Sequence, residues 1–164
     1  MKLPSASKAQ ILIGQISDEQ LKELDLVVLS PGVPTDLPVV EKMKAAGIRI
    51  WGEVELAYEN AKGDVLAITG TNGKTTTTSL LGEIMKCWKE SVYVVGNIGN
   101  PYTQAAPKMT EESVTVAEIS SFQLETIDQF HPKVSAILNI TPDHLNRHHT
   151  MEEYLSLIHI SEPT

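Results

Sequence analysis

A short glycine-containing turn after an apolar run constrains the fold more than any other feature of this chain. Val65–Ile68 has the composition of a buried β-strand, and the residues after Lys74 follow a helical period. Gly70 and Gly73 lie between these segments, where they permit positive φ and let the backbone approach an anion. Amides at a helix start, together with the helix dipole, then point at phosphate oxygens. We therefore predict a phosphate-binding loop between the strand and the helix.

The polar residues of this loop predict nucleotide and magnesium binding. Lys74 supplies a mobile positive charge for terminal phosphates, and the Thr75 hydroxyl is placed to coordinate Mg²⁺. The expected nucleotide contacts are Gly70, Thr71, Asn72, Gly73, Lys74, Thr75 and Thr76. Ile68 stands where the longer phosphate-loop pattern has its first glycine, so a plain turn with a solvated lysine is the alternative. That alternative does not explain the threonines at 75–78, because β-branched residues are mediocre helix formers.

Composition excludes several classes of protein. The chain has 164 residues, 41% of them hydrophobic, which predicts a soluble globular protein. Its formal charge of −8 argues against a nucleic-acid-binding surface, which needs a basic face. Cys87 is the single cysteine and is expected to be a small buried hydrophobic residue in a reducing compartment. No signal peptide or bilayer-length apolar run is found, so we predict a cytoplasmic location without membrane insertion.

The first part of the chain alternates strands and helices. Strands are expected at 26–29 and 48–51, and helices from Ser17 to Leu24, over 37–46 and over 53–61. This alternation predicts a parallel sheet with right-handed crossovers. Ser30, Pro31 and Gly32 end the first strand, at the edge where α/β proteins bind ligands, although a plain turn is the alternative. The pattern restarts at residues 62–64, so we predict one domain over 1–62 and a second over 63–155.

The second part adds strands at 92–95, 114–117 and 134–140. Glu118 closes the middle one, where an acidic residue near a phosphate loop is expected to hold magnesium; a solvated strand end is the alternative. Asp143 and His144 follow the last strand, at the same sheet edge as Lys74.

The sequence also predicts which side chains are exposed. His148 and His149 are expected to be exposed. The apolar face of the helix after the loop is expected to face the core, through Leu80, Leu81, Ile84 and Met85.

Four motifs of the second part resemble, in order and spacing, the Mur ligases of peptidoglycan synthesis. They are Gly70–Thr76, Gly96–Gly99, Glu118–Glu125 and Asn139–Leu145. Ser30–Val33 and Trp51–Leu56 resemble the end of that family's amino-terminal domain, and Ser120–Glu125 resembles its D-glutamate-adding branch. The resemblance implies α/β architecture with parallel sheets and flanking helices: a partial Rossmann-like N-terminal domain, then part of a P-loop ATPase-like central domain.

The resemblance also implies a reaction and the residues that perform it. ATP would phosphorylate the carboxylate of UDP-N-acetylmuramoyl-L-alanine, and the amine of D-glutamate would attack the acyl phosphate, in a cytoplasmic monomer that uses Mg²⁺. Lys74, Glu118 and His144 are then catalytic. Thr75 and Glu118 hold the first metal ion, and His144 serves the second. The implied substrate contacts are Ser30, Pro31, Gly32, Asn97 and Ser120, with Gly32 near the diphosphate.

The chain also departs from the family pattern. The family's first strand and glycine-rich turn have no counterpart before Ile11, and its carbamylated lysine and carboxyl-terminal domain have none later in the chain. Asn146 stands where the family commonly has Asp. Residues 156–164 are expected to be a non-native tail, in which His159 has no function. We therefore expect an inactive fragment of a larger enzyme.

Two other functions remain open from the sequence. A folylpolyglutamate synthase shares the central fold, but the Ser30–Gly32 block and the Thr75-Thr76 pair argue against it. A non-catalytic module that binds Mg-ATP is the other alternative. It predicts saturable nucleotide binding without phosphate release, whichever acceptor is supplied.

Overall fold

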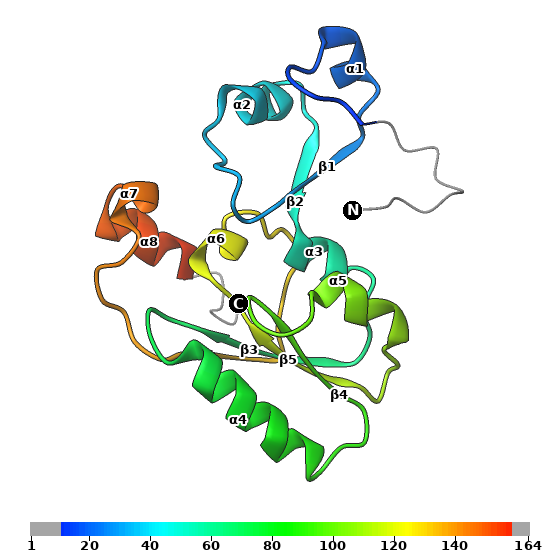
Figure 1. Cartoon of the computed structure of the whole chain (residues 1–164), viewed down its shortest axis with the longest axis vertical. Helices are drawn as coiled ribbons and strands as arrows, with labels where there is room; N and C mark the ends of the chain where they lie inside the picture. Colours follow the sequence, from blue (N-terminus) through cyan, green and yellow to red (C-terminus); the bar gives the residue numbers. More distant parts are fainter. Residues whose placement is uncertain (1–10, 159–164) are drawn as a thin grey trace.

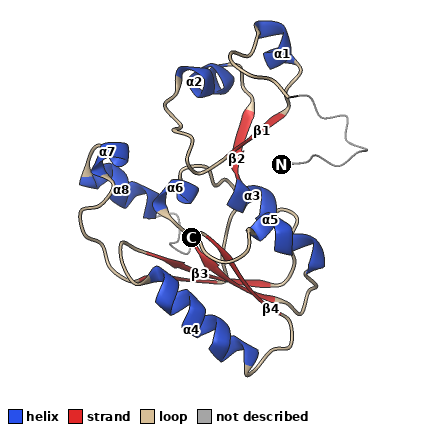
Figure 2. Cartoon of the chain, viewed as in Figure 1, coloured by secondary structure: helices blue, strands red, loops and turns tan. Residues whose placement is uncertain are grey.

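The computed structural model describes residues 11–158 and arranges their strands in two parallel sheets (Figure 1). In the first sheet β1 (Leu26–Leu29) pairs with β2 (Arg49–Gly52). The second has the order β4 (Val92–Gly96), β5 (Val114–Glu118), β3 (Asp64–Thr69), β6 (Val134–Ile137). Helices flank both sheets (Figure 2). The predicted α/β class with parallel sheets is confirmed.

Two short helices accompany the first sheet, as the sequence predicts. α1 (Asp18–Lys22) starts with a capping box, in which the Ser17 hydroxyl accepts from the Gln20 amide and the Gln20 side chain accepts from the Ser17 amide. α2 (Pro38–Ala45) ends before Gly47, whose φ of +75° places it in the left-handed region that suits a helix end.

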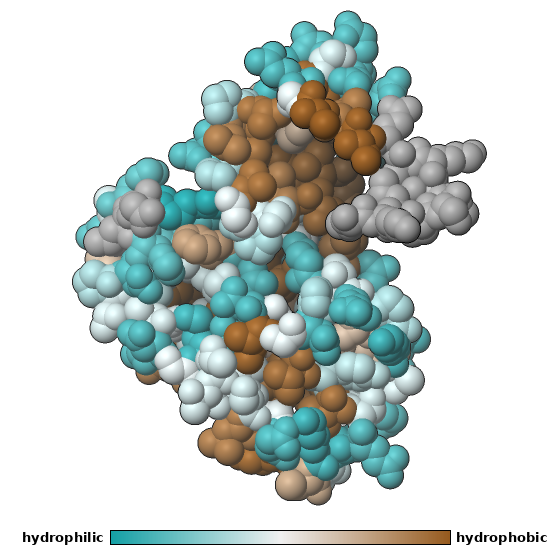
Figure 3. Space-filling model, viewed as in Figure 1, coloured by the Kyte–Doolittle hydropathy of each residue, from teal (hydrophilic) through white to brown (hydrophobic). Residues whose placement is uncertain are grey.

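The buried core of the first sheet is small. It consists of Leu21, Met43 and Ile48, with four partly buried apolar residues around them. Apolar surface is visible over this part of the molecule (Figure 3). Ile11 and Ile13 are 75% and 95% exposed, so the apolar run at the start of the described chain contributes nothing to this core.

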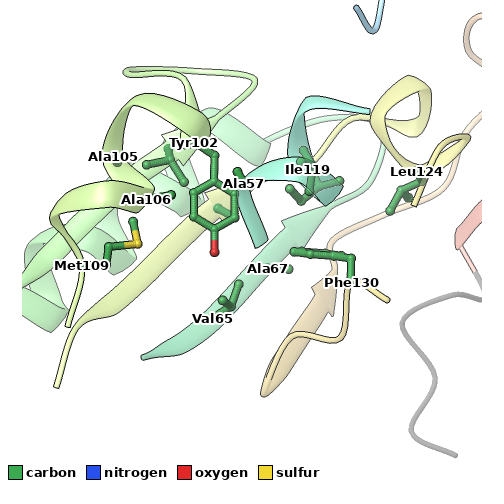
Figure 4. Close-up of a cluster of buried hydrophobic side chains, with 13 residues drawn as sticks. Ala57, Val65, Ala67, Tyr102, Ala105, Ala106, Met109, Ile119, Leu124 and Phe130 are labelled. Carbon is green, nitrogen blue, oxygen red and sulfur yellow. The ribbon is translucent and has the colours of Figure 1, made fainter. Parts of the chain in front are cut away.

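The larger core lies on one face of the second sheet. α3 (Glu53–Tyr58) follows β2 directly and packs there with α5 (Tyr102–Ala105) and the 3-10 turn η1 (Ala106–Lys108). Tyr102 is fully buried against strand residues such as Val65, and Phe130 lies beside Ala67 of the same strand (Figure 4). α3 therefore joins the two sheets, because it continues the first and packs on the second.

α4 (Lys74–Lys86) covers the opposite face of the second sheet (Figure 1), but it buries only part of the predicted face. Leu80 is 60% exposed and Ile84 is 55% exposed, so their assignment to the core is wrong. Leu81 and Met85 are half-buried, as part of the predicted face, and the fully buried positions of the helix are the small residues at 78 and 82. A Cβ at Gly82 would lie 2.4 Å from a methyl group of Val94, so only glycine permits this close approach. Cys87 follows α4 and is exposed, so its predicted burial is also wrong.

Three short helices complete the described chain: α6 (Ser121–Leu124), α7 (Leu145–His148) and α8 (Met151–Ile158). β6 stops at Ile137, earlier than predicted. Beyond it, the amide of Leu138 still bonds to the end of β3, and the carbonyl of Asn139 accepts from the phosphate loop. Residues 159–164, with His159, lie outside the described residues, as does the side chain of Asn146. Within residues 11–158, no helix has the length and apolar composition to cross a membrane.

Candidate functional site

The predicted phosphate loop lies where β3 ends and α4 begins. Gly70 has φ of +127°, and a Cβ there would lie 2.9 Å from the carbonyl oxygen of Asn139. Gly73 has φ of +83° and is the N-cap of the 13-residue α4. Both glycines are therefore required by backbone geometry, as the sequence predicts. The first turn of α4 directs its free amides toward the space above the loop.

The loop is held in shape by the segment that follows β6. The amide of Thr71 donates to the Asn139 carbonyl at 3.0 Å. The Asn139 side chain accepts from the Asn72 amide and donates to the Asn72 carbonyl, both at 2.9 Å. The Thr71 hydroxyl donates to the carbonyl of Thr141 at 3.1 Å. These bonds make the loop a preformed structure, and they give Asn139 a bracing role that the sequence analysis did not assign.

Lys74 lies over this loop. Its ammonium group donates to the carbonyl oxygens of Gly70 at 2.7 Å and Thr71 at 2.9 Å. Thr75 and Thr76, the next two residues, have exposed side chains, so their hydroxyls are accessible at the helix start. Thr78 is fully buried and belongs to the face of α4 that packs on the sheet. The structure thus brings Lys74 and Thr75 to the loop and leaves Thr78 as a packing residue.

Glu118 ends β5 beside the end of β3. Ile68 of β3 is its register partner, so its carboxylate lies at the same sheet edge as the loop. The side chain is 1% exposed, and Oε1 accepts a hydrogen bond from the Asn97 side chain at 2.9 Å. Oε2 is buried and has no hydrogen-bond partner among the described residues. A buried charged oxygen without a partner is costly, so this position suits a bound cation.

The donor set fits magnesium better than a metal held entirely by protein. Within the described residues, no group of three or more His, Cys, Asp or Glu side chains lies close enough to hold a metal ion. Proteins commonly hold Mg²⁺ through one or two carboxylates, with substrate phosphates and waters as the other ligands. One unpaired carboxylate oxygen on Glu118, at the sheet edge from which the phosphate loop leads into α4, matches that pattern.

His144 lies in the loop between β6 and α7 with φ of +52°. Its side chain is about half exposed, with Nε2 3.6 Å from Asp143 Oδ2 and the ring centroid 4.8 Å from that of Phe122. Phe122 belongs to α6, which begins three residues after Glu118. His144 is therefore accessible to a ligand, and its assignment to a metal site stays a prediction.

His148 is the one histidine whose predicted exposure is wrong. Its side chain is buried, with Nε2 2.9 Å from the Ser121 hydroxyl and its ring stacked on Tyr154. Burial lowers the pKa of His148 below its usual range, although the Glu125 carboxylate opposes that shift. His149 is exposed, as predicted.

The residues expected to contact the sugar nucleotide have structural partners of their own. Ser30 closes a turn after β1, in which its carbonyl accepts from the Val33 amide at 2.9 Å. Ser120 is the N-cap of α6 in a capping box with Gln123, a pattern that the Ser-x-x-Gln spacing signals and the sequence analysis missed. Asn97 bonds to Glu118. Their roles in substrate binding stay predictions.

Comparison with known proteins identifies the family. The Mur ligase middle domain matches residues 68–157, and the Mur ligase MurD-like N-terminal domain matches residues 1–52. UDP-N-acetylmuramoylalanine--D-glutamate ligases from Lachnoclostridium phytofermentans and Clostridioides difficile are 66% and 56% identical over 154 and 155 residues. These alignments cover 94% of this chain and 34% of each relative, so the chain spans about a third of their length.

Two solved structures share the fold at lower identity. The MurF ligase of Thermotoga maritima in complex with ADP has a TM-score of 0.52 and 21% identity, over 85% of this chain and 40% of that one. A UDP-N-acetylmuramate:L-alanyl-gamma-D-glutamyl-meso-diaminopimelate ligase from Neisseria meningitides has a TM-score of 0.50 and 20% identity, over 86% of this chain and 49% of that one. Because the Mur ligase middle domain matches more than half of its residues, this chain belongs to the Mur ligase family.

Proposed function

We propose that these residues belong to an ATP-dependent ligase that joins D-glutamate to UDP-N-acetylmuramoyl-L-alanine, in the cytoplasm and as a monomer. The relatives that match this chain at 56–66% identity carry the name of that activity. The observation that supports the proposal most strongly is the preformed phosphate loop beside Glu118. Register pairing of Ile68 with Glu118 brings an anion site and an unpaired carboxylate oxygen to one sheet edge.

In this proposal the chain's own residues hold and orient the reacting groups. The loop amides and the Lys74 ammonium bind the terminal phosphates of ATP, and the lysine charge balances negative charge that develops during transfer. Glu118 Oε2 and the Thr75 hydroxyl would hold one Mg²⁺, and His144 would serve a second. Bound Mg²⁺ supplies further neutralisation of the phosphate oxygens. The acceptor carboxylate then receives the phosphoryl group, and the amine of D-glutamate displaces phosphate from the resulting acyl phosphate.

Substrate contacts in this proposal come from both sheets. Ser30, Pro31 and Gly32 follow β1 and would approach the diphosphate of the sugar nucleotide. Asn97 and Ser120 follow β4 and β5 and would contact the muramoyl group. Parallel strands of α/β proteins bind ligands at their carboxyl ends, which supports this arrangement.

A chimeric enzyme tests the proposal. Residues 11–154 of this chain replace the aligned segment of the Lachnoclostridium phytofermentans ligase, and phosphate release is measured with ATP, UDP-N-acetylmuramoyl-L-alanine and D-glutamate. We expect release that requires all three substrates. Lys74→Ala should lose about 3 kcal/mol of transition-state stabilisation, roughly a hundredfold in turnover. Lys89→Ala, an exchange of a lysine three residues beyond the end of α4, is the matched control.

Three outcomes would contradict the proposal. If Lys74→Ala turned over substrate nearly as fast as the unsubstituted chimera, the phosphate loop would have no role in the reaction. Activity on a folate acceptor instead of the muramoyl nucleotide would favour the folylpolyglutamate synthase reading. Saturable Mg-ATP binding without phosphate release, in a chimera that melts cooperatively, would favour a non-catalytic binding module.

A further inference from the structure

Arg147 of α7 and Glu125 at the end of α6 form a two-point ion pair. Arg147 Nη2 donates to Glu125 Oε2 at 2.7 Å, and Nε donates to Oε1 at 3.1 Å. The side chains are only 17% and 9% exposed. The other ion pairs that Lys and Arg form among the described residues have both partners about half exposed or more. We call this pair the Glu125–Arg147 bridge.

The bridge also contacts the segment that follows β1 of the first sheet. Arg147 Nη2 donates to the carbonyl of Val33 at 3.1 Å, and the Thr35 hydroxyl donates to Glu125 Oε2 at 3.3 Å. Val33 and Thr35 directly follow Ser30–Gly32, the turn assigned to the sugar nucleotide. Beside the bridge, the amide of Gly52 at the end of β2 donates to the Thr126 carbonyl at 3.0 Å. The segment that follows β1 and the carboxyl end of β2 therefore bond to residues 125, 126 and 147.

The same arginine is linked to His144 through an aromatic ring. Its guanidinium carbon lies 5.3 Å from the ring centroid of Phe122, and the rings of Phe122 and His144 are 4.8 Å apart. Arg147 thus contacts, on one side, the segment next to the substrate turn and, on the other, the ring that packs on the predicted metal ligand.

The chemistry of the bridge favours a role in geometry over a role in stability. A buried ion pair returns little net stability, because both charges lose their hydration. Two parallel hydrogen bonds between guanidinium and carboxylate, however, fix distance and direction. A lysine at position 147 would keep the positive charge but could not form this pair of parallel hydrogen bonds.

We propose that Glu125 and Arg147 are positioning residues that fix the 30–35 segment, and any substrate held there, relative to the phosphate loop. The effect on turnover rests on the proposed function, whereas the effect on geometry does not. Loss of the bridge should weaken binding of the sugar nucleotide. It should leave ATP binding unchanged, because Asn139 and Thr71 brace the phosphate loop independently.

The kinetic arm of the test uses the chimera described above. Glu125→Gln and Arg147→Lys should raise KM for UDP-N-acetylmuramoyl-L-alanine by about tenfold or more, with KM for ATP within about twofold of the unsubstituted chimera. Thr35→Val removes one hydroxyl contact and serves as the milder variant if the other two fail to fold. Lys62→Ala removes an exposed ion pair with Glu111 and is the matched control. Equal changes in both KM values, or a fall in kcat alone, would overturn the positioning role.

The spectroscopic arm uses the 164-residue chain itself and holds whether or not the ligase function is correct. One spin label is placed on Cys87, the natural and exposed cysteine after α4, and the other on an introduced Ala45→Cys at the end of α2. The pair reports the distance between the helix beside the first sheet and the helix that covers the second sheet. We expect one narrow distance distribution in the parent chain and in Lys62→Ala. Glu125→Gln and Arg147→Lys should broaden or shift it. An unchanged distribution in both variants would overturn the proposal, even if the chimera were an active ligase.

Discussion

Glu55 carries the sharpest stability prediction, because its carboxylate is completely buried and bonds only to backbone amides. Oε2 accepts from the amides of Asp128 at 2.8 Å and Phe130 at 3.0 Å, and Oε1 accepts from the amide of Gln129 at 2.7 Å. One side chain of α3 thus satisfies three consecutive donors in the segment that leads to β6. Exchange of this carboxylate for an amide keeps the shape and removes the charge and one acceptor.

The magnitude of the Glu55→Gln effect follows from these contacts. The amide oxygen still accepts from two donors, but each bond weakens by about 1 kcal/mol when the acceptor becomes neutral. The amide NH₂ then faces the third N–H, and an unsatisfied buried donor costs about 1–3 kcal/mol. Part of this loss is offset because a buried charge has been removed. We therefore expect a loss of about 3 kcal/mol, a large share of the roughly 5–15 kcal/mol typical of a folded domain.

Urea unfolding followed by tryptophan fluorescence measures this loss. Trp51 adjoins Gly52 at the start of α3, so its emission reports on the region that Glu55 organises. Glu59→Gln makes the same chemical change at an exposed position one turn later, and it should alter the free energy of unfolding by less than about 0.5 kcal/mol. A loss below about 0.5 kcal/mol for Glu55→Gln as well would refute the reasoning.

Three other residues give further tests. Gly96 has φ of +106°, and a Cβ there would lie 2.1 Å from the Glu118 carbonyl oxygen, so Gly96→Ala should lose at least about 2 kcal/mol of unfolding free energy; a near-neutral result in urea would contradict this. Burial lowers the pKa of His148, so below about pH 6.5 the unfolded chain binds a proton that the folded chain does not. The free energy of unfolding therefore decreases as the pH is lowered from there to the pKa of the folded chain. His148→Gln should flatten that part of the stability profile, and an unchanged slope would show that another group titrates. Cys87 should react with a thiol reagent equally fast in folded and urea-unfolded chain, whereas hundredfold protection would mean that it is buried.

The elements that the sequence predicts well are those with a local signal. The six strands, the capped start of α1, the glycine end of α2 and the two loop glycines each depend on residues that are neighbours in the chain. The order β4-β5-β3-β6 has no such signal, because strand pairing depends on tertiary contacts. The bracing of Asn72 by Asn139 depends on that order, since β6 must lie beside β3 before the two asparagines meet.

Apart from the end of β6, the wrong predictions concern which side chains of a segment are buried. A helical period suggests an apolar face through Leu80 and Ile84, yet α4 approaches the sheet through Gly82, whose small size outweighs the apolar pattern. His148 is buried because Phe122 and Tyr154 pack on its ring, and both come from other helices. The sequence analysis made no prediction for Glu55, whose burial on a short helix is explained only by the distant donors at 128–130.

Binding of Mg-ATP to the 164-residue chain is the most direct test of the central claim, that a preformed phosphate loop beside Glu118 holds a nucleotide. Thermal unfolding is measured with and without Mg-ATP, for the parent chain and for Lys74→Ala. At about 100 times the dissociation constant, the nucleotide should add roughly 2.7 kcal/mol to the stability of the parent chain, and the gain should disappear in Lys74→Ala. A parent chain that melts cooperatively at the same temperature with and without Mg-ATP, or a Lys74→Ala variant that gains as much as the parent, would contradict the account.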